Sequence, residues 1–576
     1  MPTAVSHPTT RLSIPRVDSP QPTHPVHPLG SRARVLLTSV FGPYARDDEY
    51  GSRKMNPMEL YQNQVTREQG TFSLRMFHRS WGIMLIQANI AAPTTLLDFP
   101  DLQRLTAEIT ENTYDIIGIT SIIPNVGKVQ KMCELIREHQ PSATIVIGGH
   151  VANLPDLRER VSTDHVVRGE GVRWMRRFLG EEVSQPIIHP RVLSGINGET
   201  MGVKLSSGPG ATAATLIPSV GCPLGCNFCS TSAMFGGKGN FFHFYETGDE
   251  LFDVMCGLEK DLKVKAFFVM DENFLMHRKR ALRLLDLMIE HDKSWALYVF
   301  SSPNVLRAYT IEQLVGLGIS WLWMGLEGED ASYTKLKNVD TFELVRTLQS
   351  HGVRVLGSTI IGLENHTPEN IDRVIDHAVS HETEFHQFML YTPIPGTPLY
   401  AEHKAAGTLV DLKEVGYADS HGQYRFRHKH PHIKDGRETE MLKEAFRRDF
   451  EVNGPSIIRV ARTSLRGYQR YKNHPDRRIR NRFLWEGREL PITYAAALWV
   501  ARDRFRGNPT VYAKVSRILK DYYREFGWKT RLVTPLAGRF VRMMMKRQER
   551  RVRNGFTYEP PTFYETQRVA VAAATA

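Results

Sequence analysis

Short apolar segments alternate with amphipathic segments through most of this sequence of 576 residues. Residues 33–40, ARVLLTSV, are typical of the apolar kind, because a strand buried on both faces reads as a near-continuous hydrophobic run. Residues 126–140 are typical of the amphipathic kind, because their apolar positions recur at helical spacing. This alternation predicts an α/β fold in which helices connect parallel strands.

The first series of segments predicts a doubly wound, Rossmann-type sheet of flavodoxin-like size. We expect helices over residues 82–90, 101–111 and 126–140, and strands over residues 33–40, 94–99, 114–122, 143–150 and 164–171. In such sheets ligands bind beyond the carboxyl ends of the strands. These ends are rich in glycine and other small residues here, so the backbone can come close to a ligand.

A second series begins near residue 214 and predicts about six β/α units. The expected strands are residues 214–220, 265–274, 296–303, 321–328, 354–363 and 384–396. This number of units fits a partial (β/α)6 barrel of the TIM type, whose active groups lie at the carboxyl ends of the strands. After about residue 431 we expect no further strands, because the remaining patterns are helical.

These patterns divide the chain into four regions. They are a disordered tail at 1–31, an α/β domain at 32–185, a barrel at 205–430 and a basic helical region at 431–576. The tail is rich in Pro, Ser, Thr and His and has no apolar run, so we do not expect a secretory signal there. Residues 441–560 hold 29 Lys and Arg against 11 Asp and Glu, although the whole chain carries a net charge of only +12.

Three of the five cysteines lie within eight residues of one loop, with the spacing C-x3-C-x2-C. Neighbouring thiolates suit a soft metal centre, and Cys222, Cys226 and Cys229 suit a four-iron cluster that keeps one iron free. Two alternatives are a zinc site, which needs a fourth ligand that has no counterpart at a finger-like spacing, and a chance cluster of cysteines. An odd number of cysteines indicates a reducing compartment, so we expect a cytoplasmic protein.

The segment GCPLGCNFC resembles the cluster loop of the radical S-adenosylmethionine (SAM) enzymes. The resemblance implies that the three cysteines hold a [4Fe–4S] cluster, that SAM binds its open iron, and that Phe228 is the aromatic residue usual at that position. Three later segments, FFVMDENF, WMGLEG and GSTIIGLENHTPE, resemble strand ends of the branch that also binds cobalamin. They imply SAM contacts from Asp271, Glu272, Asn273, Glu327, Gly357 and Gly362. The alternatives are helix-capping or surface carboxylates and packing glycines.

The first sheet resembles the cobalamin-binding domain of the same enzymes. YDIIGITSIIPN, ATIVIGGHVANLP and DHVVRGEG match its last three strands in order. The resemblance implies cobalamin contacts from Ser121, Gly148, Gly149, His150, Gly169, Glu170 and Gly171. The D-x-H-x-x-G signature is absent, because Asp164 and His165 are followed by two valines, so we expect cobalt to lack a histidine lower ligand. A sheet without a ligand is the alternative.

The combined resemblance implies an enzyme that cleaves SAM reductively to a 5′-deoxyadenosyl radical, which removes hydrogen from an unactivated carbon. The first hypothesis is a cobalamin-dependent C-methyltransferase. The second is an enzyme of the same architecture that forms rings or carbon–carbon bonds without methyl transfer, like the anaerobic porphyrin cyclases of this branch. The third is a binding or regulatory protein without turnover.

The expected partners are a small-molecule or lipid substrate and a reductant of the flavodoxin or ferredoxin type. The basic C-terminal region favours peripheral contact with a membrane, where Met543, Met544 and Met545 stand between Arg542 and Lys546. Nucleic acid is a rival partner, because basic and aromatic residues interleave at 466–485. A solvated helical face is the third interpretation. No apolar run approaches the length of a membrane span.

Overall fold

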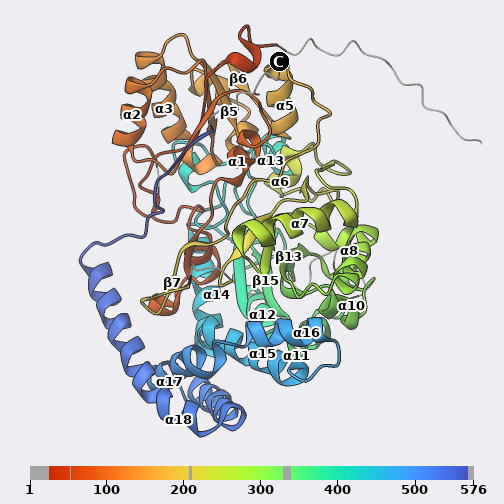
Figure 1. Cartoon of the computed structure of the whole chain (residues 1–576). Coiled ribbons are helices and arrows are strands. Elements are labelled where there is room, and N and C mark those ends of the chain that lie inside the picture. Colours follow the sequence, from red (N-terminus) through yellow and green to blue (C-terminus); the bar gives the residue numbers. More distant parts are fainter. Residues whose placement is uncertain (1–24, 52, 207–209, 328–335, 337–338, 568–576) are drawn as a thin grey trace, which may run out of the picture.

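The structure is a computed structural model that describes residues 25–51, 53–206, 210–327, 336 and 339–567 (Figure 1). Most of the tail predicted at residues 1–31 lies outside the described residues. Its last part is described, and Gly30–Arg32 forms a short 3-10 helix. No helix within the described ranges is long and apolar enough to cross a membrane.

The first sheet is the parallel, flavodoxin-like sheet that the sequence predicted. Its five parallel strands lie in the order β3-β1-β4-β5-β6, which is the 2-1-3-4-5 order of that fold. The strands are β1 (Val35–Ser39), β3 (Thr94–Asp98), β4 (Ile116–Thr120), β5 (Thr144–Gly148) and β6 (His165–Val166). The helices are α1 (Trp81–Gln87), α2 (Leu102–Glu111), α3 (Val126–His139), α4 (Leu157–Arg160) and α5 (Gly171–Phe178). Two apolar clusters cover the two faces of the sheet, which explains the continuous apolar runs.

The second sheet has the six parallel strands expected of a partial barrel, in the order β9-β12-β13-β14-β15-β16. The strands are β9 (Ala213–Leu216), β12 (Ala266–Val269), β13 (Ala296–Ser301), β14 (Ile319–Gly325), β15 (Arg354–Ile361) and β16 (Phe385–Leu390). The helices are α7 (Gly248–Leu262), α8 (Arg278–Glu290), α9 (Pro303–Leu306), α10 (Ile311–Gly316), α11 (Thr341–Ser350), α12 (Ile371–Ser380) and α13 (Pro398–Ala405). The predicted α/β fold class is therefore confirmed.

The first strand of the barrel is shorter than predicted. The segment expected as one strand over 214–220 is divided into β9 and a separate strand, β10 (Ser219–Gly221). β10 pairs antiparallel with β11 (Phe241–His243) in a two-stranded sheet. The interruption falls at Pro218, which has no N–H to continue the hydrogen-bonded ladder.

The C-terminal region is mainly helical, as predicted. Its helices are α14 (Arg437–Asn453), α15 (Ser456–Tyr471), α16 (Arg477–Glu486), α17 (Ala495–Arg504) and α18 (Pro509–Arg553), with a π-helical turn at Leu490–Tyr494. α18 is kinked at Gly527, whose φ of 75° lies outside the helical region. Met545 is buried in the apolar core between these helices, so only part of the methionine run considered for a membrane is exposed.

Four of the basic and aromatic residues of 466–485 are buried in the protein, namely Tyr471, Arg478, Arg482 and Phe483. The guanidinium groups of Arg478 and Arg482 donate hydrogen bonds to the carbonyl oxygens of Gly316 (3.1 Å) and Ile319 (3.3 Å). The ring of Tyr471 stacks on that of Phe483, with 4.5 Å between the ring centres. These contacts close the amino-terminal end of the barrel, and they make the four buried side chains inaccessible to a nucleic acid.

The expectation that no strand follows residue 431 is wrong. Residues 563–567 form β17 (Phe563–Gln567), which pairs antiparallel with β3 at the edge of the first sheet. The Arg79 guanidinium lies over the Phe563 ring at 3.9 Å. The carboxylate of Glu559 accepts backbone N–H bonds from Tyr44 (2.7 Å) and Ala45 (3.2 Å). We call residues 558–567 the C-terminal strap, because they return from the helical region and bind the first sheet (Figure 1).

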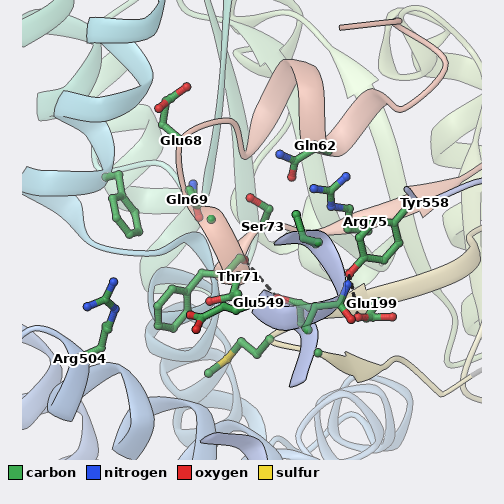
Figure 2. A pocket seen from close by; sticks show the side chains of 18 of the residues that line it. Gln62, Glu68, Gln69, Thr71, Ser73, Arg75, Glu199, Arg504, Glu549 and Tyr558 are labelled. Carbon is green, nitrogen blue, oxygen red and sulfur yellow. Dashed lines mark hydrogen bonds between the residues drawn. The ribbon is translucent and has the colours of Figure 1, made fainter. Parts of the chain in front are cut away.

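A cavity of about 720 Å³ lies away from the carboxyl ends of both parallel sheets (Figure 2). It opens beside a small antiparallel sheet of β2 (Arg75–Phe77), β7 (Ile196–Thr200) and β8 (Val203–Lys204). Acidic and basic side chains from several elements line it, including Arg75, Glu199 and Tyr558. The Tyr558 hydroxyl donates to the Glu199 carboxylate at 2.9 Å, so the strap also forms part of this wall.

Candidate functional site

The three clustered cysteines lie on a loop between β10 and a short helix, α6 (Ser230–Met234). The Cys229 sulfur caps this helix by accepting the backbone N–H of Ser232 at 3.5 Å. The Ser232 hydroxyl donates to the carbonyl oxygen of Cys222 at 3.2 Å, which ties the two ends of the loop together. The loop turns at Gly225, where φ is 66° and an added Cβ would lie 2.4 Å from the side chain of Lys238.

The thiols are partly buried and act on one another electrostatically. Burial, together with the nearby Cys226 and Glu272, raises the pKa of Cys222 to about 12 and that of Cys229 to about 11. Within the described part of the chain, no three His, Cys, Asp or Glu side chains converge as ligands of a single metal ion. A four-iron cluster needs a wider arrangement, because each thiolate binds a different iron. Three neighbouring thiols in a desolvated loop, which iron would deprotonate, fit that donor set.

Asp271 holds the cysteine loop in place from the end of β12. Its buried carboxylate accepts hydrogen bonds from the Arg280 guanidinium (2.7 Å), the Ser219 hydroxyl and the Asn273 backbone N–H (3.0 Å). Because Ser219 begins β10, this network fixes the strand that leads into Cys222. The ion pair with Arg280 positions the loop, and the expected contact of Asp271 with SAM stays a prediction.

Asn273 has a similar positioning geometry. Its side-chain amide donates to the Ser302 hydroxyl at 3.2 Å and accepts from the Ser301 hydroxyl at 3.0 Å. Asn273 is buried, and these bonds join the ends of β12 and β13. Its side chain therefore binds the neighbouring strand, and the expected cofactor contact stays a prediction.

Glu272 is the acidic side chain of this segment that faces the cysteines. Part of the Glu272 residue is accessible to solvent. The surrounding protein nevertheless desolvates its carboxylate. This desolvation, with a smaller contribution from the charge of Asp271, raises the pKa of Glu272 to about 7. Its electrostatic influence on Cys222 and Cys229 places it beside the loop.

Glu327 follows β14, whereas Gly357 lies on the neighbouring strand β15 and Gly362 directly after it. Glu327 is buried directly after β14, where its φ of 49° turns the chain and its N–H donates to the Ser358 carbonyl at 3.0 Å. A Cβ at Gly357 would lie 2.7 Å from Leu326, and one at Gly362 would lie 2.3 Å from the Phe426 ring. Both glycines are closely packed, and the contacts with SAM expected from them stay predictions.

Phe228 joins the cysteine loop to the far side of the barrel. Its ring meets that of Tyr391 edge-on, with 6.1 Å between centres, beside the apolar side chains of Ile360 and Leu363. The neighbouring Asn227 accepts the backbone N–H of Leu399 at 3.0 Å. The loop is thus anchored at both the first and the last strands of the barrel.

The carboxyl ends of β4 and β5 leave space for a ligand in the first sheet. A Cβ at Gly148 would meet no atom within 4 Å, whereas one at Gly149 would lie 2.6 Å from the Ser121 carbonyl oxygen. The Ser121 N–H donates to the Gly148 carbonyl oxygen at 3.3 Å, and its hydroxyl donates to the carbonyl oxygen of the next residue. His150 follows on a short 3-10 helix (His150–Asn153), and its buried Nδ1 has no hydrogen-bond partner among the described residues. Open space beside an unpaired polar atom fits a large polar cofactor such as cobalamin.

The third predicted loop of this sheet has mixed roles. The carboxylate of Glu170 caps α5 by accepting backbone N–H groups, including that of Arg173 at 2.9 Å. A Cβ at Gly171 would lie 3.0 Å from the Ile86 side chain. These two residues therefore cap and pack α5, and the cofactor contacts expected from them stay predictions. Gly169 has a φ of 88° and open space, with the Met234 carbonyl oxygen the nearest atom, 3.9 Å from an added Cβ.

The two sets of strand ends meet at α6. Gly169 approaches Met234 at the end of that helix, and the Asn153 side chain donates to the Ser230 carbonyl oxygen at its start (3.3 Å). Figure 1 shows α6 at the junction of the first domain and the barrel. A ligand at the edge of the first sheet would therefore lie close to the cysteine loop.

Two family models match the chain, one in the first α/β domain and one in the barrel. Residues 78–179 match the B12 binding domain, and residues 216–378 match the radical SAM superfamily. The chain is a radical SAM enzyme with a B12-binding domain. Its cofactors are a [4Fe–4S] cluster, SAM and cobalamin.

The relatives of this radical SAM enzyme are distant. It is 24% identical to an uncharacterized methyltransferase, PH0819, of Pyrococcus horikoshii, over 65% of this chain and 88% of that one. It is 26% identical to the bacteriochlorophyllide d C-12(1)-methyltransferase of Chlorobaculum tepidum, over 50% of this chain and 66% of that one. Among solved structures, the radical SAM methyltransferase TsrM from Kitasatospora setae covers 79% of this chain and 99% of its own, with 14% identity and a TM-score of 0.48.

Sequence reasoning missed the residues that hold the cysteine loop. Arg280 is one of them, and it shares the buried face of α8 with Leu284 and Leu287. A charged residue at a core position of an amphipathic helix indicates a buried partner, which is the signal that could have found it. Nothing in the sequence marks Ser219 or Asn153 in this way.

Proposed function

We propose that this protein is a cobalamin-dependent radical SAM C-methyltransferase. The observation that carries the proposal is the meeting of the two strand edges at α6, since it would bring cobalamin and SAM to one substrate. When bound, the cluster and SAM supply a carbon radical and cobalamin supplies a transferable methyl group. Both named relatives in sequence are methyltransferases, which agrees with this step.

In this proposal the residues of the chain hold and shield the reacting groups. Cys222, Cys226 and Cys229 bind the cluster, and the pair of Asp271 and Arg280 fixes their loop. The open backbone at Gly148 and Gly169 admits the corrin, beside the unpaired nitrogen of His150. Glu272 and Glu327 border the SAM site from the ends of β12 and β14.

Aromatic side chains fill the interior of the barrel. The rings of Phe300 and Trp323 stack with 5.0 Å between centres, and those of Trp321 and Phe385 with 5.1 Å. Such an interior excludes water, which a carbon radical requires. We propose that the substrate is apolar, for example a lipid. We also propose that a reductant of the flavodoxin or ferredoxin type supplies the electron and that the protein contacts a membrane peripherally.

The test uses protein purified anaerobically and reconstituted with iron and sulfide. Iron, sulfide and bound corrinoid are measured, and SAM with a deuterated methyl group is then added with dithionite and a lipid extract. We expect 5′-deoxyadenosine and a lipid that carries the deuterated methyl group.

The outcomes separate the alternatives. Deoxyadenosine without corrinoid or label would favour the enzyme that forms rings or carbon–carbon bonds, and zinc without SAM cleavage would favour the binding protein. The variant Cys226→Ala should lose iron and deoxyadenosine, whereas Cys256→Ala, on α7, should retain both.

A further inference from the structure

The second half of α18 presents an apolar stripe to solvent. The exposed fractions are 70% for Trp528, 66% for Leu532, 62% for Leu536, 53% for Phe540 and 57% for Met543. These residues follow one another at intervals of four, four, four and three, so their side chains lie on one side of the helix. Single exposed apolar residues are ordinary, but a continuous stripe of this length indicates a binding surface.

The opposite side of the helix is fixed against the protein. Thr530, Thr534 and Gly538 are buried there at the same spacing of four. An added Cβ at Gly538 would lie 2.4 Å from the Trp499 ring, which shows how closely α18 approaches α17. Arg542 also pairs with Asp503 at 2.8 Å. The helix therefore cannot rotate to bury its apolar stripe without losing this packing.

Figure 1 shows this part of α18, drawn in blue, along the outer edge of the molecule. Its side chains add a strong positive charge to the stripe. Residues 528–553 hold nine Lys and Arg against one acidic residue, Glu549. Lys529, Arg539 and Lys546 are exposed on the side of the stripe, and they form no salt bridge with any described residue.

A bilayer with anionic lipids offers both of the complements that this surface needs. Its acyl region accepts aliphatic and aromatic side chains, and its headgroups attract the interspersed Lys and Arg. Trp at one end of the stripe is the residue most favoured at the boundary between headgroups and acyl chains. A nucleic acid would use the positive charge but not the Leu and Met side chains.

We propose that the exposed face of α18 from Trp528 to Met543 docks this protein on an anionic membrane surface. The face differs from the methionine run first considered, because Met545 lies in the core and only Met543 belongs to the stripe. The proposal gives a place to the membrane contact in the proposed function. It does not depend on methyl transfer, because binding to vesicles requires no SAM.

The experiment uses the full-length protein with sucrose-loaded vesicles. One set is phosphatidylcholine alone, and the other is equal parts of phosphatidylcholine and phosphatidylserine. We expect sedimentation with the anionic set, less with the neutral set, and release as salt is raised. The fluorescence of Trp528 should shift to shorter wavelength when the protein binds the vesicles. The variant Trp528→Phe should lack this shift.

A triple variant tests the stripe itself. Leu532→Ser, Leu536→Ser and Phe540→Ser together should lower the vesicle partition coefficient by roughly a hundredfold or more. The matched control is Ile289→Ser, because Ile289 is 55% exposed on α8, in the barrel. That variant should bind as the parent does.

Three results would overturn the proposal. They are failure of the parent protein to bind the anionic vesicles, equal binding by the triple variant, and a dimer by light scattering that the triple variant dissociates. The last result would assign the stripe to a second copy of the chain. All three measurements are made without SAM, so none of them tests the proposed reaction.

Discussion

The carboxyl ends of the two parallel sheets are built in contrasting ways. At the first sheet, Gly148 and Gly169 leave open space. At the barrel, a buried ion pair and several hydroxyl and amide groups bind one another around the cysteine loop. The first edge leaves room for a large preformed ligand to approach its backbone. The second holds a loop that must itself provide the ligand atoms.

The largest effect should come from the cysteines of the barrel edge. Alanine at any one of Cys222, Cys226 and Cys229 should abolish reductive cleavage of SAM and lower the iron content, because each thiolate binds a separate iron. The assay is 5′-deoxyadenosine formation with dithionite. Retained activity in any of the three would break the assignment of this edge to the cluster.

The next effect concerns the open space of the first sheet. Gly148→Leu should fill the space beside β5 and lower corrinoid affinity by at least about a hundredfold, because a large side chain would stand where the ligand approaches. Iron content should stay unchanged. Gly257→Leu on α7 is the control, since it also meets open space and lies away from both edges. Normal corrinoid binding by Gly148→Leu would place the ligand elsewhere.

The ion pair of the barrel edge should matter for stability. Asp271→Asn leaves the Arg280 guanidinium buried without its charge partner, which costs about 3–5 kcal/mol in the free energy of unfolding. Asp249→Asn removes the partner of Arg283 in an exposed pair between α7 and α8, and it should cost far less because solvent screens that pair. Urea unfolding of both variants measures the difference. Similar losses would show that the network at this edge is not the rigid frame inferred for it.

The smallest effect should come from the strap. Glu559→Gln weakens the charged acceptor of the Tyr44 and Ala45 N–H groups, and it should destabilise the first domain by about 1.5 kcal/mol. Glu565→Gln should have a smaller effect, because Glu565 is 45% exposed in its pair with Arg79. Hydrogen exchange at Tyr44 and Ala45 reports the change. If the amides of Tyr44 and Ala45 exchange no faster in Glu559→Gln than in the parent, the strap does not hold this loop.

The strands of both sheets were predictable because they are short apolar runs buried by helices. The division of the first barrel strand follows from Pro218, whose effect the apolar pattern concealed. Asp271 was correctly placed at a strand end, but its partner Arg280 lies on another element, and a spacing pattern cannot show which groups meet. The SAM contact expected at Gly357 stays a prediction, and the close packing of this glycine against Leu326 could not be read from the sequence.

The strand β17 escaped prediction for a different reason. Its sequence, FYETQ, is five residues long and largely polar, since an edge strand has a neighbour on only one side. Its pairing depends on β3, which the chain reaches much earlier. No local pattern near residue 563 points to that partner.

The pairing of β17 with β3 also orders events during synthesis. The strap contacts Phe99 through Thr562, 463 residues further along the chain, so the first sheet leaves the ribosome long before its last strand exists. Until then β3 is an open edge with unpaired backbone groups, which invites pairing with other nascent chains. The first sheet is therefore completed only after the barrel and the helical region have been translated.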